Sequence, residues 1–255
     1  MNSDLLQFYQ SECDEGARLR SQAGQVEFRT TMHHLRRWCP PGARVLDCCA
    51  GTGVYSFALA EEGYRVCAGD LVPKNVCQIA ARQRETPLLE SVFQADMTDL
   101  SRFEDGSFDA VLCLGAYYHL CCEEERLAAV REGLRVLRPG GRFFLAYLNR
   151  YANFVQYAPE MPADFALFER YLETGVTNGL FYAATPEMVE GEMSALGLEI
   201  LQNVAADGPL FYLRDAIDRM SPAVFERYLA AHLRQCGVRS NLGVSEHGLL
   251  CCKKK

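Results

Sequence analysis

Residues 45 to 53 read Val45-Leu46-Asp47-Cys48-Cys49-Ala50-Gly51-Thr52-Gly53, and the fold is decided in this stretch. An apolar strand ends in an acidic residue and is followed directly by a turn of small residues that opens a helix. Glycines allow the backbone to approach a ligand closely, and a helix that starts here offers free N–H groups. Because any tight turn between a strand and a helix can use glycine, the neighbouring segments must supply the specificity.

On both sides of this stretch, short apolar runs alternate with longer amphipathic segments. This pattern predicts helices at 53–62, 73–84 and 123–137 and strands at 44–48, 64–69, 91–94, 109–114, 142–148, 198–204 and 248–253. Alternating strands and helices imply a mostly parallel sheet covered on both faces, with ligands at the carboxyl ends of its strands. The expected fold is therefore a three-layer, doubly wound α/β domain.

The two ends of the pattern differ from its centre. Residues 1–43 are predicted to form an N-terminal helical cover, and residues 44–255 the main domain. Within that domain, two aromatic-rich and irregular segments, about 149–185 and 207–240, interrupt the last strands. Additions at the carboxyl edge of a sheet commonly select substrate, so we expect these segments to form a lid.

Composition excludes several classes of protein. The chain has 255 residues and a net charge of −7, which disfavours nucleic acid and anionic membrane surfaces as partners. The first residues lack the layout of a secretory signal, and the longest uncharged run, 110–122, is too short to cross a bilayer. A cytoplasmic location is expected. The 12 cysteines contain no Cys-x-x-Cys pair, so we interpret them as small, reduced, mostly buried side chains.

Acidic residues follow three successive predicted strands. Asp47 ends the first strand, Asp70 ends the second, seventeen residues after Gly53, and Asp96 comes just past the third. A carboxylate at the end of the second strand is placed to accept both hydroxyls of a ribose. Because the carboxyl ends of parallel strands meet at one edge of the sheet, these acids should converge on one crevice.

At this point the chain resembles the class I S-adenosylmethionine-dependent methyltransferases, in particular the small-molecule branch that includes the ubiquinone and menaquinone C-methyltransferases. The resemblance covers about 44–148 in four ordered motifs: 45–53, 66–71, 94–97, and 108–120 with the 138–141 turn behind it. Cys49 departs from the pattern, standing where the family most often has a glycine. The resemblance implies seven strands in the order 3-2-1-4-5-7-6 and S-adenosylmethionine as cofactor.

The resemblance also implies which residues bind that cofactor. They are Asp47, Ala50, Gly51, Gly53, Asp70, Leu71, Asp96, Met97, Leu114 and Gly115. Asp47 would orient the ammonium of the methionine moiety, and Asp70 would hold the ribose. Asp96, with the backbone of Met97, would read the adenine edge.

Candidates for catalysis follow the fourth predicted strand. Tyr117, Tyr118 and His119 would lie at the methyl end of the cofactor, and His119 has a pKa suited to proton abstraction at neutral pH. A capping role for His119 and a packing role for the tyrosines are equally consistent with the sequence. Arg18, in the N-terminal segment, could supply a cation to the site or lie on a solvated helix face.

Other ligands and other roles stay open at this stage. A dinucleotide would want a third small residue where Ser56 stands, and the Asp47 carboxylate would lie close to its phosphates, so a cationic ligand fits better. The histidines lack zinc-ligand spacing, and no metal is assigned. The function predicted is methyl transfer to a small molecule. The alternatives are a non-catalytic cofactor-binding scaffold and a nicotinamide-dependent oxidoreductase. The acceptor and the oligomeric state are not specified by the sequence.

Overall fold

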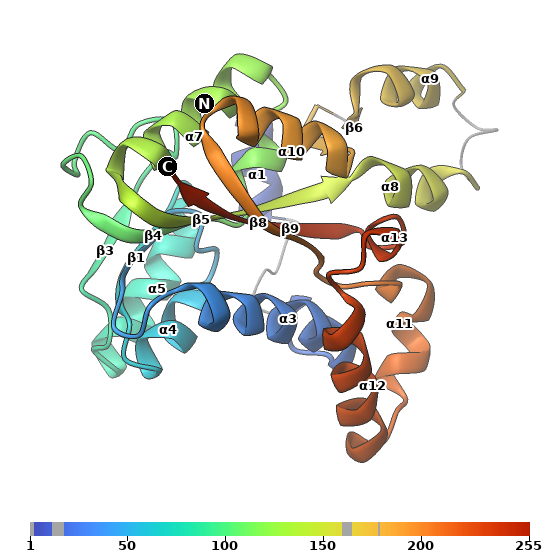
Figure 1. Ribbon diagram of the computed structural model, residues 1–255, viewed down its shortest axis with the longest axis horizontal. Coiled ribbons are helices and arrows are strands. Elements are labelled where there is room, and N and C mark those ends of the chain that lie inside the picture. The colour runs from blue at the N-terminus through green and yellow to red at the C-terminus, as the bar shows by residue number, and fades with distance from the viewer. Residues whose placement is uncertain (1–2, 12–17, 160–164, 178) are drawn as a thin grey trace.

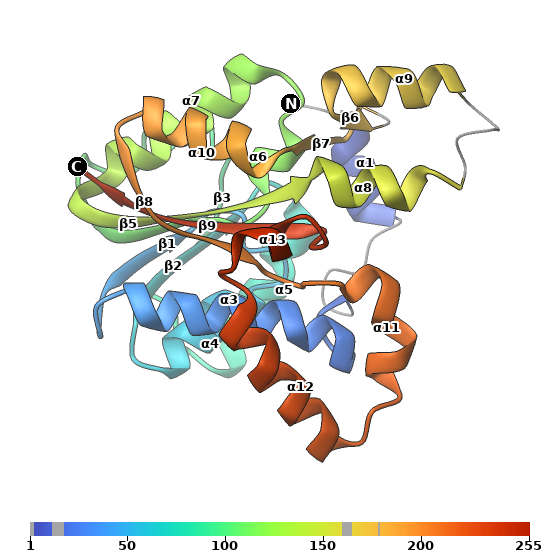
Figure 2. The ribbon, with the colours of Figure 1, turned by 45° about the vertical axis from the view of Figure 1, so that its right-hand side comes forward.

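The computed structural model describes residues 3–11, 18–159, 165–177 and 179–255. A central sheet lies between two layers of helices, with α7 and α10 over one face and α3, α4 and α5 over the other (Figures 1 and 2). Parts of the predicted N-terminal cover, 1–2 and 12–17, and of the predicted lid, 160–164 and 178, lie outside the described residues.

The main path of the sheet confirms the predicted strand order. Its strands are, across the sheet, β3 (Ser91–Gln94), β2 (Arg65–Asp70), β1 (Arg44–Asp47), β4 (Phe108–Cys113), β5 (Leu137–Asn149), β9 (His247–Lys254) and β8 (Leu198–Ala205). The first five are parallel, whereas β9 runs antiparallel between β5 and β8. The carboxyl ends of β1 to β4 therefore open toward one edge.

Two short strands extend this sheet beyond the seven that were predicted. β6 (Val176–Thr177) and β7 (Phe181–Ala184) form a hairpin, and β7 pairs with the last two residues of β5. β5 has 13 residues and β4 only six, so the end of β5 continues past its neighbour. The hairpin supplies hydrogen-bond partners for backbone groups that would otherwise be unpaired there.

The connecting helices begin where local chemistry favours them. α5 (Pro73–Glu85) and α10 (Pro186–Ala195) start with proline, whose fixed φ suits the first turn, and Thr185 caps the second of these helices. α7 (Glu123–Val136) carries three glutamates in its first turn, which stabilise the positive end of the helix dipole. α4 (Val54–Glu61) follows the glycine turn directly.

The predicted irregular segments are largely helical, which corrects that part of the prediction. The first contains α8 (Arg150–Tyr157) and α9 (Phe165–Thr174); the second contains α11 (Leu210–Asp218), α12 (Pro222–Gln235) and α13 (Arg239–Leu242). Leu210 and Ile217 lie two turns apart and pack with Val26 of α3 (Gln22–Trp38), so helical spacing buries their apolar face. The remaining N-terminal helix is α1 (Ser3–Ser11).

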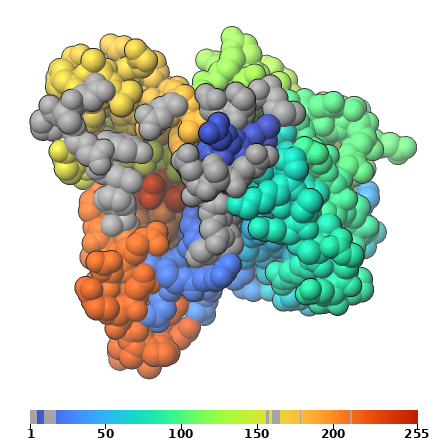
Figure 3. All heavy atoms as spheres, turned by 180° about the vertical axis from the view of Figure 1, so that it is seen from behind, coloured from blue at the N-terminus to red at the C-terminus, as the bar shows by residue number. Residues whose placement is uncertain are grey.

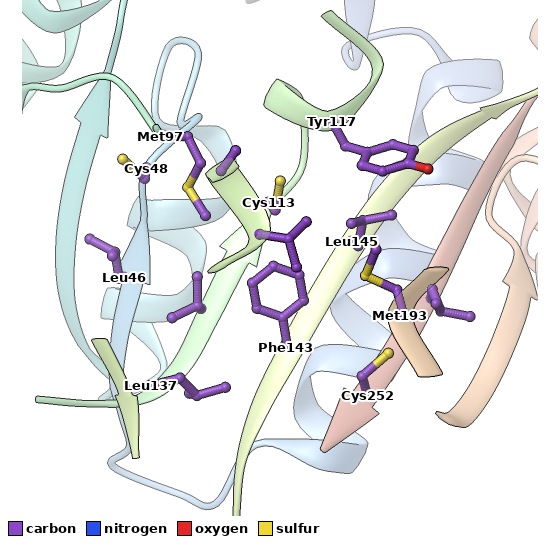
Figure 4. Packing of buried hydrophobic residues seen from close by; sticks show 14 of the residues in the cluster. Leu46, Cys48, Met97, Cys113, Tyr117, Leu137, Phe143, Leu145, Met193 and Cys252 are labelled. Carbon is purple, nitrogen blue, oxygen red and sulfur yellow. The ribbon is translucent and has the colours of Figure 1, made fainter. Parts of the chain in front are cut away.

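Two apolar clusters occupy the two faces of the sheet. Phe143 and Phe144 are consecutive on β5 and belong to different clusters, because neighbouring residues of a strand point to opposite faces. Cys251 and Cys252 do the same on β9, and both are buried and free. Figure 4 shows the first cluster, with Phe143 between Leu46 and Leu145.

Truncation of either phenylalanine should strongly destabilise the fold. Both side chains are completely buried, so Phe143→Ala and Phe144→Ala should each lower the free energy of unfolding by about 3 to 5 kcal/mol. Tyr151→Ala is the control, since this aromatic side chain is 63% exposed. Urea denaturation measures all three variants. An equal loss in the control and the core variants would contradict this arrangement of the core.

Candidate functional site

A cavity of about 700 Å³ opens where β1, β2, β3 and β4 end. Seven of the ten predicted cofactor residues line it: Gly51, Asp70, Leu71, Asp96, Met97, Leu114 and Gly115. Cys49, which stands in place of the family's glycine, also lines the wall. Ala50, Gly53 and Asp47 lie behind that wall and do not contribute to it. Seven of the predicted positions thus border one cavity, and the other three are not part of its lining.

The turn after β1 takes a conformation that requires glycine. Gly51 and Gly53 have φ values of 54° and 81°, in the left-handed region that other residues rarely adopt. A Cβ on Gly53 would also lie 3.2 Å from Phe57 and Ile79. Ala50 N–H donates to the carbonyl of Gly69 at 3.0 Å, which holds the turn against the end of β2.

Asp70 binds the turns after β1 and β2 together. Its Oδ2 accepts a hydrogen bond from Gly51 N at 2.8 Å, and its Oδ1 accepts from Val72 N at 2.9 Å and from Asn75 Nδ2 at 3.1 Å. These donors fix the carboxylate at the wall of the cavity. Asp96 is fixed similarly, since its Oδ1 accepts from the backbone and hydroxyl of Thr98.

Asp47 is a buried acid close to the same wall. Its Oδ2 accepts from Ser56 Oγ at 2.5 Å, and its Oδ1 has no hydrogen-bond partner among the described residues. Burial raises the pKa of Asp47 to about 7, and the charge of Asp70 acts in the same direction. A cation bound near Asp47 would offset this cost of ionisation.

The three predicted catalytic residues lie on α6 (Ala116–His119) but have different surroundings. Tyr118 and His119 line the cavity. Tyr117 does not: its hydroxyl donates to Glu192 of α10 at 2.7 Å, and its ring is buried in the core (Figure 4). The prediction for Tyr117 is corrected, because successive residues of a helical turn point in different directions.

His119 makes a hydrogen bond with each ring nitrogen. Tyr9 Oη donates to Nε2 at 2.6 Å, and Nδ1 lies 3.1 Å from the carbonyl oxygen of Leu180, to which it donates. Burial lowers the pKa of His119 to about 4, so the ring is neutral at pH 7. Tyr9 belongs to α1, which also contributes Leu5 to the cavity wall. In Figure 3, α1 lies in dark blue on the surface between the part of the chain that contains α5 and the insertion that contains α9.

A second cavity of about 960 Å³ adjoins the first, and Tyr9 and Tyr118 line both. Phe8, Leu148, Phe181 and Leu210 give it apolar walls. Its charged and ionisable groups come from five parts of the chain: Arg18, Glu27, Asp207, Arg214, Glu246 and His247. A cavity that combines apolar walls with convergent polar groups is typical of a small-molecule site.

The charged groups of this second cavity balance one another. Arg18 forms two hydrogen bonds with the carboxylate of Glu27, and His247 Nδ1 donates to Asp207 Oδ2 at 2.8 Å. Glu27, Asp207 and His247 offer ligand atoms within 4.8 Å of one another. The guanidinium of Arg18 and the imidazolium of His247 already supply the positive charge that these two carboxylates require.

Apart from the option considered for Arg18, these groups were not found from the sequence. One signal was available: Ser245, Glu246 and His247 are consecutive polar residues directly before a strongly apolar strand, and Asp207 follows the end of another strand. Because β8 and β9 are antiparallel neighbours, the end of one meets the start of the other. Glu27 gave no such signal, since acidic residues on helices are usually solvated.

Comparison with known proteins agrees with this geometry. Residues 46–145 match a family described as a methyltransferase domain. A ubiquinone biosynthesis O-methyltransferase of Xanthomonas campestris is 33% identical over 170 residues, which are 63% of this chain and 66% of that protein. The match therefore spans just under two thirds of the relative's length.

Solved structures share the fold at lower sequence identity. A putative methyltransferase of Haloferax volcanii, in complex with the activator Trm112, superposes with a TM-score of 0.63 at 20% identity and covers 100% of this chain and 98% of that one. A geranyl diphosphate methyltransferase, solved in complex with geranyl diphosphate and sinefungin, superposes with a TM-score of 0.59 at 18% identity. The superposition covers 91% of this chain and 80% of that one.

These findings confirm the resemblance that the sequence motifs suggested. Residues 46–145 form a methyltransferase domain of the class I, S-adenosylmethionine-dependent type, and the chain has the fold of these enzymes. As for membranes, no helix in the described ranges is long and apolar enough to span one.

The buried acid Asp47 should make stability depend on pH. Its pKa of about 7 in the folded protein exceeds the value of about 3.9 for an unfolded chain, so ionisation destabilises the fold as pH rises between these values. When the pH is raised from 5 to 8, the free energy of unfolding of Asp47→Asn should therefore increase by about 2 to 3 kcal/mol relative to that of the parent. Urea denaturation at both pH values, with Asp105→Asn as an exposed control, measures this gain. An Asp47→Asn difference that is equal at both pH values would refute the assignment.

Proposed function

We propose that this protein transfers a methyl group from S-adenosylmethionine to a small-molecule acceptor. The observation that carries the proposal is the first cavity, where Asp70 of β2 and Asp96 after β3 meet the glycine turn that follows β1. The buried Asp47 Oδ1 has no hydrogen-bond partner within the described part of the chain and would gain one from a ligand cation near it. S-adenosylmethionine carries such cations and, when bound, supplies an electrophilic methyl group on its sulfonium.

The residues of the cavity fit the parts of this cofactor. The ammonium of its methionine end would lie toward Asp47, with the Gly51 turn along it. Asp70 borders the cavity at the end of β2, where its carboxylate would accept hydrogen bonds from the ribose hydroxyls. Asp96 would accept from the adenine edge, and Leu71 would pack on the ring.

The acceptor would occupy the second cavity, on the other side of Tyr118. We propose that the N-terminal region 1–43 and the insertions 149–185 and 207–240 together cover this site, because residues of all three line the cavity. Enclosure excludes water and holds the nucleophile in line with the methyl group. The hydrogen bond from Tyr9 to His119 would then serve to hold α1 in place.

The net charge and the free cysteines of the protein support a class of partner and a cellular location. A net charge of −7 favours a small-molecule acceptor over nucleic acid or an anionic membrane surface. The cysteines of the described residues are free, which supports the reducing cytoplasm as the proposed location.

One observation favours a second candidate, a role that depends on a protein partner. Apolar side chains are exposed in the first insertion at Tyr151, Val155, Phe165, Leu167 and Leu172. Exposed apolar residues that gather on one segment can mark an interaction surface. In that case cofactor binding would require the partner and would be absent from the isolated chain.

Calorimetric titration with S-adenosylhomocysteine tests the cofactor site. We expect micromolar binding, no binding of NADH, and at least a tenfold weaker affinity in Asp70→Ala, because the ribose hydroxyls lose their acceptor. Asp105→Ala, at an exposed acid paired with Arg135, is the matched control and should bind like the parent. Equal affinity of Asp70→Ala and parent, or binding of NADH alone, would contradict the proposal. Absence of all binding would favour the partner-dependent role.

Tyr9→Phe tests whether α1 closes the cofactor cavity. The variant keeps the ring and removes the hydroxyl that donates to His119, which should speed dissociation of S-adenosylhomocysteine by about threefold to tenfold. Stopped-flow displacement measures this rate, and Tyr151→Phe, at an exposed position, is the control. An unchanged dissociation rate in Tyr9→Phe would show that α1 does not retain the ligand.

A further inference from the structure

The second cavity contains a histidine and an acid that the sequence motifs did not mark. His247 is the first residue of β9, and Asp207 comes two residues after the end of β8. Both border the cavity assigned above to the acceptor. The side chain of Asp207 is 2% exposed and that of His247 is 17% exposed, so the pair is largely shielded from solvent.

Asp207 is held firmly and in turn fixes the ring of His247. Its Oδ1 accepts from Ser245 Oγ at 2.5 Å and from the backbone N–H of His247 at 3.2 Å. Its Oδ2 lies 2.8 Å from His247 Nδ1. When the ring is neutral, a carboxylate in this position keeps the remaining proton on Nδ1 and leaves the lone pair of Nε2 for a bound molecule.

The pair lies beside Tyr118, a residue that the two cavities share. Tyr118 borders the cofactor cavity and the acceptor cavity, and its ring centroid is 6.4 Å from that of His247. A third cavity of about 320 Å³ is bordered by Tyr118 and His247 together with Leu114 of the cofactor cavity wall. An acceptor in the second cavity would therefore have His247 on one side and the methyl group on the other.

His119 is less suited to take a proton from the acceptor. Its Nε2 already accepts from Tyr9, and its Nδ1 donates to a backbone carbonyl. His247 has its Asp207 contact at Nδ1 and lies in the acceptor cavity itself. The two histidines thus divide the roles: one joins α1 to the body of the protein, and the other faces the acceptor.

We propose that His247, positioned by Asp207, is the general base of methyl transfer. The proposal rests on the function proposed above. In the step, the acceptor's oxygen forms a bond to the methyl carbon while the carbon–sulfur bond breaks and leaves its electron pair on sulfur. The proton of the acceptor's hydroxyl passes to Nε2 of His247 and from there to solvent, so charge and atoms balance.

This role also defines the class of acceptor. A thioether or a tertiary amine has no proton to lose and needs no base, whereas a hydroxyl does. The walls near Phe8, Phe181 and Leu210 are apolar, and the ionised groups gather at Glu27 and His247. The acceptor that fits is a weakly acidic hydroxyl, phenol or enol, on an apolar body.

The charges that surround His247 predict the pH dependence of the reaction. Burial disfavours the imidazolium, but the carboxylates of Glu27 and Asp207 raise the pKa of His247 to about 9. The other ionisable groups near it are Glu246 on its own chain segment, Arg18, Arg214, and the hydroxyls of Tyr55 and Tyr118. Since the base must be neutral, the rate should rise with pH up to about 9.

The first test uses S-adenosylmethionine with a panel of simple phenols and records S-adenosylhomocysteine formed between pH 6 and 10. We expect His247→Asn to lower kcat/KM by at least about 100-fold at pH 9. Calorimetry on the same sample should show unchanged affinity for S-adenosylhomocysteine. His33→Asn, at an exposed histidine of α3, is the matched control and should behave like the parent.

The second variant, Glu27→Gln, separates a chemical role from a structural one. It removes one of the negative charges that hold the proton on His247, so the pH–rate profile should move to lower pH and the rate at pH 7 should increase. A merely structural role of this cluster would instead lower the rate at every pH. Asp207→Asn should lower the rate at all pH values, because the ring loses its orientation.

If no phenol in the panel is methylated, 4-nitrophenol serves as a binding probe in the complex with S-adenosylhomocysteine. At pH 6, where His247 is an imidazolium, the parent should stabilise the bound phenolate and so raise its absorbance, and His247→Asn should not. Identical spectra in both proteins, or a His247→Asn turnover within threefold of the parent, would overturn the role of His247 while leaving the cofactor site intact. Failure of the parent to bind S-adenosylhomocysteine would instead overturn the proposed function, and this proposal with it.

Discussion

The carboxylate of Asp70 is the constraint on which the cofactor cavity depends. It lies at the end of β2 and accepts hydrogen bonds from the turn after β1 and from the start of α5. Two turns that are 19 residues apart in the chain are thereby held in one geometry. Each turn alone could take several conformations, and a shared anionic acceptor selects the one in which backbone amides face a common point.

The site contains buried charge of two kinds. Close to the cofactor cavity, Asp47 is buried with no positively charged hydrogen-bond partner among the described residues, so it is costly to ionise before a ligand binds. In the acceptor cavity, Glu27 and Asp207 are buried with Arg18 and His247 beside them, and the pKa of Glu27 is lowered despite its burial. The first arrangement favours binding of a cation, whereas the second keeps a charged network in place before any ligand is bound.

The part of the site that the sequence revealed is the part built from short-range contacts. Asp47, Gly51 and Asp70 lie within 24 residues, and a strand, a turn and a helix in succession fix where they point. The pairing of His247 with Asp207 joins residues 40 apart, and Glu27 reaches them from a helix near the other end of the chain. Such contacts depend on the antiparallel placement of β9, which no local pattern expresses.

Local sequence patterns also did not predict features that depend on the three-dimensional position of a residue rather than on its type. Tyr117 and Tyr118 are neighbours of the same type, yet one donates to Glu192 in the core and the other borders both cavities. The two side chains point in different directions because they occupy successive positions on the four-residue helix α6. The hairpin of β6 and β7 was missed for a similar reason, because only the excess length of β5 creates a partner for it.

The position of α1 has a consequence for the proposed catalytic cycle. Leu5 and Tyr9 line the cofactor cavity, while Phe8 and Tyr9 line the acceptor cavity, so one helix forms part of the wall of both. Displacement of α1 would open the two cavities together rather than in turn. The spent cofactor and the methylated product would then share one exit, and a single gating event would govern turnover of both.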